Sequence, residues 1–442
     1  MRRNIEKDLV EWKNQGDCNP LIIRGARQVG KTYLIENFGK KYFTNFVTVN
    51  FEYQPRLKMV FNSLNPMDIL NRLELIFKTE IVPGESLLFL DEIQECPAAI
   101  LALRYFKEKL PDLHVIGAGS LLEFILNSPD FRMPVGRVSF LHLYPFSFGE
   151  FLEACGNSRL RDHLANITLA DIIDPVIHDE CLQLLKQYCF LGGMPAVLKS
   201  YFKNKNFLKS QNILSTIIEG YRNDFGKYSK RTNYTLLQHL FEKVPQLVGE
   251  RFKYAKVSHE VRSREIKHAL KLLNQAGLVT QIYASSGSGL PLGALINERK
   301  FKILFLDVGL LQRACGLDEE TFLQDDLLKI NAGAVAEQFV GQEIISQGNP
   351  YQKNSLFFWV RDKKYSEAEV DFLFATSNQI FPIEVKSGKT GTLKSLRTFI
   401  NDNNLPFGIR VSESPLSLYD QVLSVPLYMI EHLPRLVKEA AV

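Results

Sequence analysis

A glycine-bounded loop near the N-terminus constrains this chain more than any other stretch. The apolar run Leu21–Ile23 leads into the pattern G-x-x-x-x-G-K-T, and helix-forming residues follow from Tyr33. Glycine permits backbone geometry that a side chain would obstruct, so the loop amides and the next helix N-terminus can face a polyphosphate. We expect Lys31 to reach the β and γ phosphates of ATP, and Thr32 to bind Mg²⁺. The predicted phosphate-binding residues are Gly25, Ala26, Arg27, Gln28, Val29, Gly30, Lys31 and Thr32.

Two adjacent carboxylates follow a second apolar run. Leu87–Leu90 is continuously apolar, which indicates a strand buried on both faces, as in a parallel sheet. Asp91 and Glu92 come next, at the end of the strand where open α/β sheets bind ligands. We expect Asp91 to hold Mg²⁺, and Glu92 to orient and deprotonate the water that attacks the γ-phosphate. The alternative is an acidic helix cap without a catalytic role.

Further polar residues are candidates for the same site. Ser120 follows the apolar run 113–116 and is a candidate sensor beside the γ-phosphate, with a Gly-Ser turn as the alternative. Arg132 and Arg137 precede another apolar strand pattern. One of them, with Arg137 as our choice, is expected to neutralise transition-state charge, either within the chain or from a neighbouring subunit. A solvated basic turn is the alternative.

Length and composition place these motifs in an ordinary globular protein. The 442 residues are enough for about three domains, and 45% of them are hydrophobic, which suffices for buried cores. The net charge of +4 permits a local nucleic-acid-binding patch without demanding one. The chain shows no apolar secretory segment, no run of about 18 apolar residues and no C-x-x-C pair. We therefore expect a cytoplasmic protein with reduced thiols and no membrane association.

Four segments together resemble one bacterial and archaeal family of AAA+-related ATPases that carry a C-terminal domain of unknown function. They are the phosphate loop, L-L-F-L-D-E-I-Q at 87–94, G-A-G-S at 117–120 and the run from Gly136 to Leu152. The resemblance extends over nearly the whole chain. It implies an AAA+-type core, a helical lid beside the nucleotide, a winged helix and a C-terminal domain of PD-(D/E)xK nuclease-like fold. The G-A-G-S segment departs from the T-G-S-S type usual in the family, which affects only the assignment of Ser120.

The pattern after residue 231 is typical of a winged helix. Helices are predicted over 235–244, 257–261 and 264–276, the last capped by Ser263, and a strand follows. The third helix carries basic residues away from its apolar face: Arg264, Lys267, His268 and Lys271. Such a helix can enter the major groove of double-stranded DNA. The alternative is a structural winged helix with a solvated polar face.

A second set of charged residues lies near the C-terminus. The patterns from residue 332 run helix, strand, strand, strand, helix, strand, an order that resembles the PD-(D/E)xK fold. Strand side chains alternate, so Glu384 and Lys386 share one face, and Asp371 joins them if its strand is the hairpin partner. The resemblance implies that Glu337, Asp371 and Glu384 bind a second divalent cation, and that Lys386 orients or activates water for phosphodiester hydrolysis. The alternative is an ion pair of Lys386 with Glu384 or with Asp371 in a scaffold that has lost activity.

The predicted fold class is α/β with four parts. We expect residues 1–147 to form a P-loop AAA+-type core with a parallel sheet, 148–230 a helical lid, 231–290 a winged helix, and 291–442 a linker and the nuclease-like domain. The first functional hypothesis is an ATPase whose nucleotide state controls a metal-dependent, DNA-directed nuclease. The second is an ATP-driven switch whose C-terminal domain only binds DNA or a protein. AAA+ relatives often form rings, whereas related switch ATPases stay monomeric until activated, so a homo-oligomer is one of two expectations.

Overall fold

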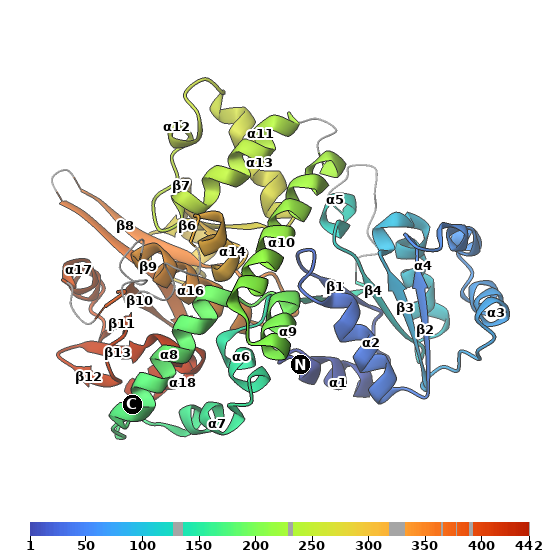
Figure 1. Ribbon diagram of the computed structural model, residues 1–442, viewed down its shortest axis with the longest axis horizontal. Helices are drawn as coiled ribbons and strands as arrows, with labels where there is room; N and C mark the ends of the chain where they lie inside the picture. Colours follow the sequence, from blue (N-terminus) through green and yellow to red (C-terminus); the bar gives the residue numbers. More distant parts are fainter. Residues whose placement is uncertain are drawn as a thin grey trace.

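The computed structural model has two sheets with a group of helices between them (Figure 1). It describes residues 1–126, 136–228, 233–317, 332–363, 366–376, 378–388 and 392–441. Arg132 lies outside this part of the chain. Among the described helices, none is long and apolar enough to cross a lipid bilayer.

The N-terminal sheet is parallel and has the strand order β2-β3-β4-β1-β5. Its strands are β1 (Leu21–Arg24), β2 (Asn45–Asn50), β3 (Ser86–Asp91), β4 (His114–Ala118) and β5 (Ser139–His142). The helices around it are α1 (Glu6–Asn14), α2 (Lys31–Tyr42), α3 (Pro66–Phe77), α4 (Pro97–Lys109) and α5 (Leu122–Leu126), with short 3₁₀ turns η1 (Pro55–Ser63) and η2 (Ile93–Glu95). The predicted parallel-sheet core is confirmed.

Alternating residues of β3 show why this sheet needs cover on both faces. Leu87 and Phe89 pack in the core that includes α1 and α2, whereas Leu88 and Leu90 pack in the core that includes α3 and α4. All four side chains are fully buried. The continuous apolar run therefore forms a central strand, because both faces of a parallel sheet are covered by helices.

Helices fill the middle of the chain. They are α6 (Phe148–Ala154), α7 (Ser158–Asn166), α8 (Pro175–Leu191), α9 (Pro195–Asn204), α10 (Phe207–Tyr228), α11 (Tyr234–Lys243), α12 (Tyr254–Val257) and α13 (Ser263–Gln275), with the 3₁₀ turn η3 (Val244–Leu247). The helix predicted over 257–261 is wrong, since α12 ends where that prediction begins. Ser263 is the first residue of α13 rather than its cap, and no side chain caps this helix.

The second sheet has eight strands in the order β12-β13-β11-β10-β9-β8-β6-β7. They are β6 (Val279–Ser285), β7 (Ile296–Phe305), β8 (Phe357–Lys363), β9 (Ser366–Thr376), β10 (Gln379–Val385), β11 (Gly408–Ser412), β12 (Ser417–Tyr419) and β13 (Val422–Pro426). The accompanying helices are α14 (Val308–Ala314), α16 (Ala332–Gln347), α17 (Lys394–Asn403) and α18 (Leu433–Ala440), with turns η4 (Leu292–Leu295) and η5 (Leu427–His432).

The hairpin of β6 and β7 connects the middle of the chain to this C-terminal sheet. β6 pairs antiparallel with β7 and parallel with β8, through Tyr283 and Ala284. The predicted order helix, strand, strand, strand, helix, strand is present as α16, β8, β9, β10, α17 and β11. The winged-helix and nuclease-like assignments themselves stay predictions.

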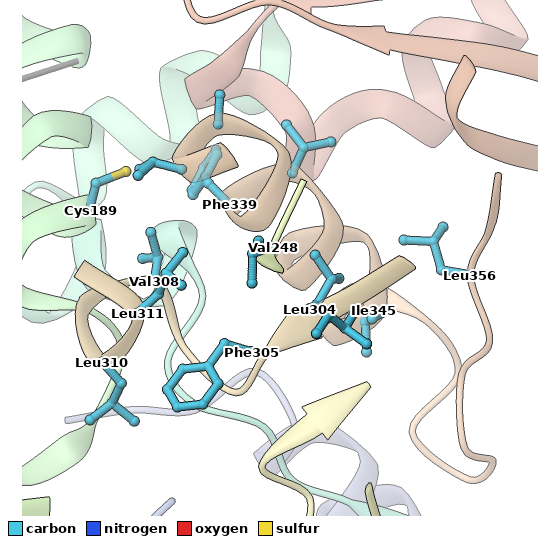
Figure 2. Close-up of a cluster of buried hydrophobic side chains, with 14 of the residues drawn as sticks. Cys189, Val248, Leu304, Phe305, Val308, Leu310, Leu311, Phe339, Ile345 and Leu356 are labelled. Atoms are coloured by element: carbon cyan, nitrogen blue, oxygen red, sulfur yellow. The ribbon is translucent and has the colours of Figure 1, made fainter. Parts of the chain in front are cut away.

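One hydrophobic core runs through the middle and the C-terminal parts. Figure 2 shows side chains from several of these elements in one cluster, among them Cys189 of α8, Phe305 of β7, Leu311 of α14 and Phe339 of α16. This core includes residues from Phe146 to Val437. The parts that follow the N-terminal sheet are therefore packed as a single unit.

Candidate nucleotide site and C-terminal carboxylate cluster

The glycine-bounded loop lies between β1 and α2, at the carboxyl edge of the parallel sheet. Gly25 has φ +148, and a Cβ there would collide with the backbone oxygen of Leu143. Gly30 has φ +97 and directly precedes α2. Both positions therefore require glycine, and the loop amides and the start of α2 are available to an anion.

Lys31 is buried within this loop. Its Nζ donates hydrogen bonds to the carbonyl oxygens of Gly25 and Ala26, at 2.9 and 2.8 Å. Burial lowers the pKa of Lys31 to about 8, against the opposing effect of the nearby carboxylates of Glu92 and Asp91. A phosphate in the loop would stabilise the ammonium by supplying a close anion. The loop therefore fits a polyphosphate.

Thr32 and Asp91 meet below the loop. The Thr32 hydroxyl donates to Asp91 Oδ1 at 3.2 Å, and the Asn50 side-chain amide donates to Asp91 Oδ2 at 2.9 Å. Burial and the adjacent Glu92 raise the pKa of Asp91. A hydroxyl and a carboxylate are oxygen ligands of the kind that Mg²⁺ prefers. These residues fit Mg²⁺, which would neutralise phosphate charge when bound with ATP.

Glu92 is held beside the same site by a residue that the sequence did not indicate. Its backbone is left-handed, with φ 48, and Gln94 donates its side-chain amide to Glu92 Oε2 at 2.6 Å. The backbone amide of Ser120 approaches the same oxygen at 3.5 Å. Gly119 leaves room for Gln94, because a Cβ there would collide with the Gln94 side-chain oxygen and displace it. The structure thus brings Glu92 and the backbone of Ser120, which follows β4, close together.

Arg137 lies away from this site within the chain. It precedes β5 by two residues, and Ser139 pairs with Leu21 at the start of β1. The phosphate loop leaves the other end of β1. Arg137 is half exposed and pairs with Glu108, with Nε 3.4 Å from the carboxylate oxygen. The fold therefore does not bring Arg137 to the phosphate loop of its own chain, and only a role from a neighbouring subunit stays a prediction.

Elements far along the chain contact the phosphate loop directly. The Tyr221 hydroxyl of α10 donates to the Arg27 carbonyl oxygen at 2.8 Å, and Asp224 forms an ion pair with the Arg27 side chain. A Cβ on Gly277, just after α13, would lie 3.3 Å from the Ala26 Cβ. The loop is therefore in direct contact with α10 and with the residue that ends the turn after α13.

The predicted C-terminal residues also come together. β9 and β10 pair antiparallel, with Phe372 opposite Ile383, so Asp371 and Glu384 are neighbours across the hairpin. The backbone amide of Val385 donates to Asp371 Oδ2 at 2.9 Å, and Lys386 Nζ lies 2.6 Å from Glu384 Oε1. The expected hairpin is present, and so is the Glu384–Lys386 ion pair that was considered as the alternative to a metal site. Their chemical role stays a prediction.

Two charged residues that we did not predict complete this group. Lys302 of β7 forms ion pairs with Glu337, Glu369 and Asp371, and its side chain is 1% exposed. We refer to Glu337, Glu369, Asp371 and Glu384 as the carboxylate cluster. The one available signal was a lysine in the apolar run from Phe301 to Leu306. In the described part of the chain, no group of histidine, cysteine or acidic residues is arranged to hold a metal ion.

Comparison with known sequences divides the chain into three matched regions. Residues 17–152 match the AAA domain, residues 182–321 match a domain of unknown function (DUF8612), and residues 332–428 match another (DUF4143). No curated protein matches the chain.

Comparison with solved structures finds similar ATPase-type folds. The Walker-type ATPase PABY2304 of Pyrococcus abyssi is 14% identical with a TM-score of 0.46, and the alignment covers 71% of this chain and 95% of that one. The ORC1 protein of Aeropyrum pernix, solved in complex with DNA, is 12% identical with a TM-score of 0.28, covering 72% and 93%. The RuvB Holliday junction branch migration motor of Thermotoga maritima is 14% identical with a TM-score of 0.31, covering 63% and 89%.

Because these TM-scores are low, the assignment depends on the family match and on the geometry of the loop. The loop, Lys31, Thr32, Asp91 and Glu92 all lie inside the matched region. Residues 17–152 are therefore an AAA-type P-loop ATPase domain.

Proposed function

We propose that this protein is an ATP-driven switch, in which hydrolysis at the AAA-type domain changes the contacts of the P-loop with α10 and α13. The single observation that carries this proposal is the position of Arg27. It lies inside the P-loop, yet its carbonyl and its side chain are both held by α10. A triphosphate that reorders the loop therefore acts on α10, which belongs to the core shared with the C-terminal sheet.

The residues have distinct roles in the proposed hydrolysis. Lys31 and the loop amides bind the phosphates, while Thr32 and Asp91 hold Mg²⁺. Glu92 accepts a proton from the attacking water, and Gln94 keeps its carboxylate in place. We assign contact with the γ-phosphate to Ser120, whose backbone amide lies 3.5 Å from Glu92 Oε2, and an arginine from a second copy would complete the site.

Two substitutions test the ATP site. We expect Lys31→Ala to weaken ATP binding, and Glu92→Gln to retain ATP but hydrolyse it about a hundredfold more slowly, because the general base is lost. ATP affinity and single-turnover hydrolysis are the measurements. Glu95→Gln is the control, since Glu95 is exposed and pairs only with Lys58 at 3.2 Å among the described contacts. Normal turnover in Glu92→Gln would overturn the assignment of the base.

A separate experiment tests whether the nucleotide state of the P-loop changes the structure of α10 and α13. Hydrogen exchange of Glu92→Gln, which should hold ATP without turnover, is measured with ATP and with ADP. Altered protection in α10 and α13 is the expected result. Identical exchange in both elements with either nucleotide contradicts the switch while leaving the ATPase assignment intact.

We further propose double-stranded DNA as the partner of the middle region. The four basic residues predicted on α13 are all exposed: Arg264, Lys267, His268 and Lys271. Lys267→Glu with Lys271→Glu should therefore weaken duplex binding and reduce its salt dependence, as measured by fluorescence anisotropy. Lys199→Glu with Lys203→Glu on α9 makes the same charge change at exposed sites and is the control. Equal loss in both double variants would contradict a specific role for α13.

Metal-dependent DNA cleavage under nucleotide control is the second candidate function. The convergence of Asp371, Glu384 and Lys386 on the β9–β10 hairpin supports it. Incubation of plasmid and duplex DNA with Mg²⁺ or Mn²⁺, with ATP and with ADP, tests this candidate. Cleavage that disappears in Asp371→Asn supports this candidate. Intact DNA under every condition contradicts it and favours a switch whose C-terminal domain binds its partner without cleaving it.

A further inference from the structure

A lysine ammonium lies among the oxygen atoms of the carboxylate cluster. Lys302 Nζ is 2.9 Å from Glu337 Oε1, 2.8 Å from Glu369 Oε1 and 3.2 Å from Asp371 Oδ1. The three carboxylates come from α16 and from β9, whereas Lys302 comes from β7. The Lys302 ammonium of β7 therefore pairs with three carboxylates, which come from α16 and β9.

Because the group is buried, its carboxylates depend on the positive charge of Lys302 for compensation. Lys302 is 1% exposed and Glu337 is 7% exposed. The surrounding carboxylates raise the pKa of Lys302 above its ordinary value, with Glu337 as the largest contributor against the opposing effect of burial. Removing one partner from a buried ion pair leaves an uncompensated charge, which is strongly destabilising. The cluster as folded thus depends on a monovalent cation that is part of the chain.

Glu384 provides a second, independent sign that the cluster is built to surround a cation. It is 8% exposed, and one of its carboxylate oxygens, Oε2, has no hydrogen-bond partner in the described part of the chain. Its other oxygen pairs with Lys386 at 2.6 Å. Burial, together with the neighbouring Asp371, raises the pKa of Glu384 to about 7.

These residues do not fit a divalent cation in the arrangement described. A hard divalent cation needs its carboxylate oxygens at about 2.0–2.6 Å, with no other cation between them. Here Glu337, Glu369 and Asp371 point oxygens at Lys302 Nζ instead. A metal ion and this ammonium would share the same ligands and repel each other.

We propose that Lys302 is the resident cation of the carboxylate cluster, where it excludes a divalent metal and fastens β7 to the C-terminal sheet. The proposal does not depend on ATP hydrolysis, and it opposes metal-dependent cleavage at this cluster while Lys302 stays in place. Under this proposal, access of a metal ion to the carboxylate cluster depends on the position of β7. A metal reaches these carboxylates only when β7 withdraws Lys302.

The test is Mn²⁺ binding by the full chain without nucleotide, followed by electron paramagnetic resonance and calorimetry. The wild-type chain should show no Mn²⁺ site that depends on Asp371. Lys302→Met should gain one Mn²⁺ site, with affinity about tenfold or more above wild type, and Asp371→Asn added to it should remove that site. Lys386→Met is the matched control, since it removes the other lysine of the group and leaves Lys302 in place.

Two results would overturn the proposal. One is a wild-type chain that binds Mn²⁺ and loses it in Asp371→Asn. The other is a folded Lys302→Met variant that binds no additional Mn²⁺. If Lys302→Met does not fold, the pair Lys302→Met with Glu369→Gln removes one charge of each sign and keeps Glu337, Asp371 and Glu384. In that variant, gain of Mn²⁺ supports the proposal and its absence contradicts it.

Discussion

At the scale of single residues, the nucleotide site depends on how Glu92 is held. Glu92 follows a buried strand in a left-handed conformation that non-glycine residues rarely adopt, and its carboxylate accepts a hydrogen bond from buried Gln94. Such conformations persist where the surrounding contacts require them, and they are frequent at functional sites. The absence of a side chain at Gly119 makes room for Gln94. Gln94 is therefore a positioning residue for the proposed base.

Replacement of Gln94 tests whether this residue positions Glu92 or contributes to ATP binding. In Gln94→Ala the Glu92 carboxylate loses the hydrogen bond that holds it in place. We therefore expect kcat for ATP hydrolysis to fall about tenfold with little change in KM, because Gln94 positions the proposed base and does not bind ATP. Steady-state kinetics measure both constants. Gln15→Ala, at an exposed position, is the control. A change confined to KM, or unchanged kinetics, contradicts the positioning role.

At the scale of elements, α10 links the P-loop to the rest of the molecule. Its Tyr221 is 1% exposed and its Asp224 is 4% exposed, and both engage Arg27. The helix also packs against α9, α11 and α14. In Figure 1, α10 runs between the N-terminal sheet and the helices α11 and α13. A single helix thus contacts the nucleotide loop and the proposed DNA-binding region.

Tyr221→Phe removes one hydrogen bond of this contact and keeps the ring. The Arg27 carbonyl then loses a buried donor, so we expect the free energy of unfolding to fall by about 1 kcal/mol. We also expect ATP affinity to change, since the loop is less restrained. Urea unfolding and ATP titration are the measurements. Tyr419→Phe, whose ring is 82% exposed, is the control, and equal effects in both variants would contradict the proposed link.

At the scale of the whole molecule, a shared core joins the middle part of the chain to the C-terminal part. Figure 2 shows that residues of β7, α14 and α16 pack together, although the sequence suggested a boundary near residue 290. Glu343 of α16 is 1% exposed within this unit and accepts a hydrogen bond from the Phe148 amide at 3.0 Å. Burial raises the pKa of Glu343 to about 8.

This buried acid gives stability a pH dependence with a definite sign. Between the ordinary value of 4.5 and about 8, the folded chain holds a proton that the unfolded chain has lost. The contribution of Glu343 to stability is therefore complete below pH 4.5 and is lost as pH rises through 8. Glu343→Gln cannot ionise and keeps an acceptor for Phe148. At pH 8 we expect the free energy of unfolding of Glu343→Gln to exceed that of wild type by more than about 1 kcal/mol. At low pH we expect this difference to be smaller.

Urea unfolding at low pH and at pH 8 checks this expectation for the Glu343→Gln variant. Glu11→Gln, at an exposed position on α1, is the control and should track wild type at both pH values. The same stability difference between Glu343→Gln and wild type at both pH values would contradict the assignment.

Local chemistry follows from the order of the amino acids. The P-loop works through the geometry of a few consecutive residues, so their order alone was enough to assign Gly25, Gly30 and Lys31 to it. The two-residue alternation of a strand likewise placed Glu384 and Lys386 on one face. Pattern alone failed where the signal was weak, as for the helix predicted over 257–261. It could not decide between the two roles predicted for Arg137, because the distance of Arg137 from the P-loop depends on strand order.

Which distant residues meet is a property of the folded chain. Arg27 and Asp224 are 197 positions apart, and Lys302 and Asp371 are 69 apart. No local pattern specifies such pairs, because they arise only when packed elements bring buried charges together and each charge must then find a partner. The motifs therefore predicted where a triphosphate would bind, while packing determined that a lysine from β7 lies among Glu337, Glu369 and Asp371.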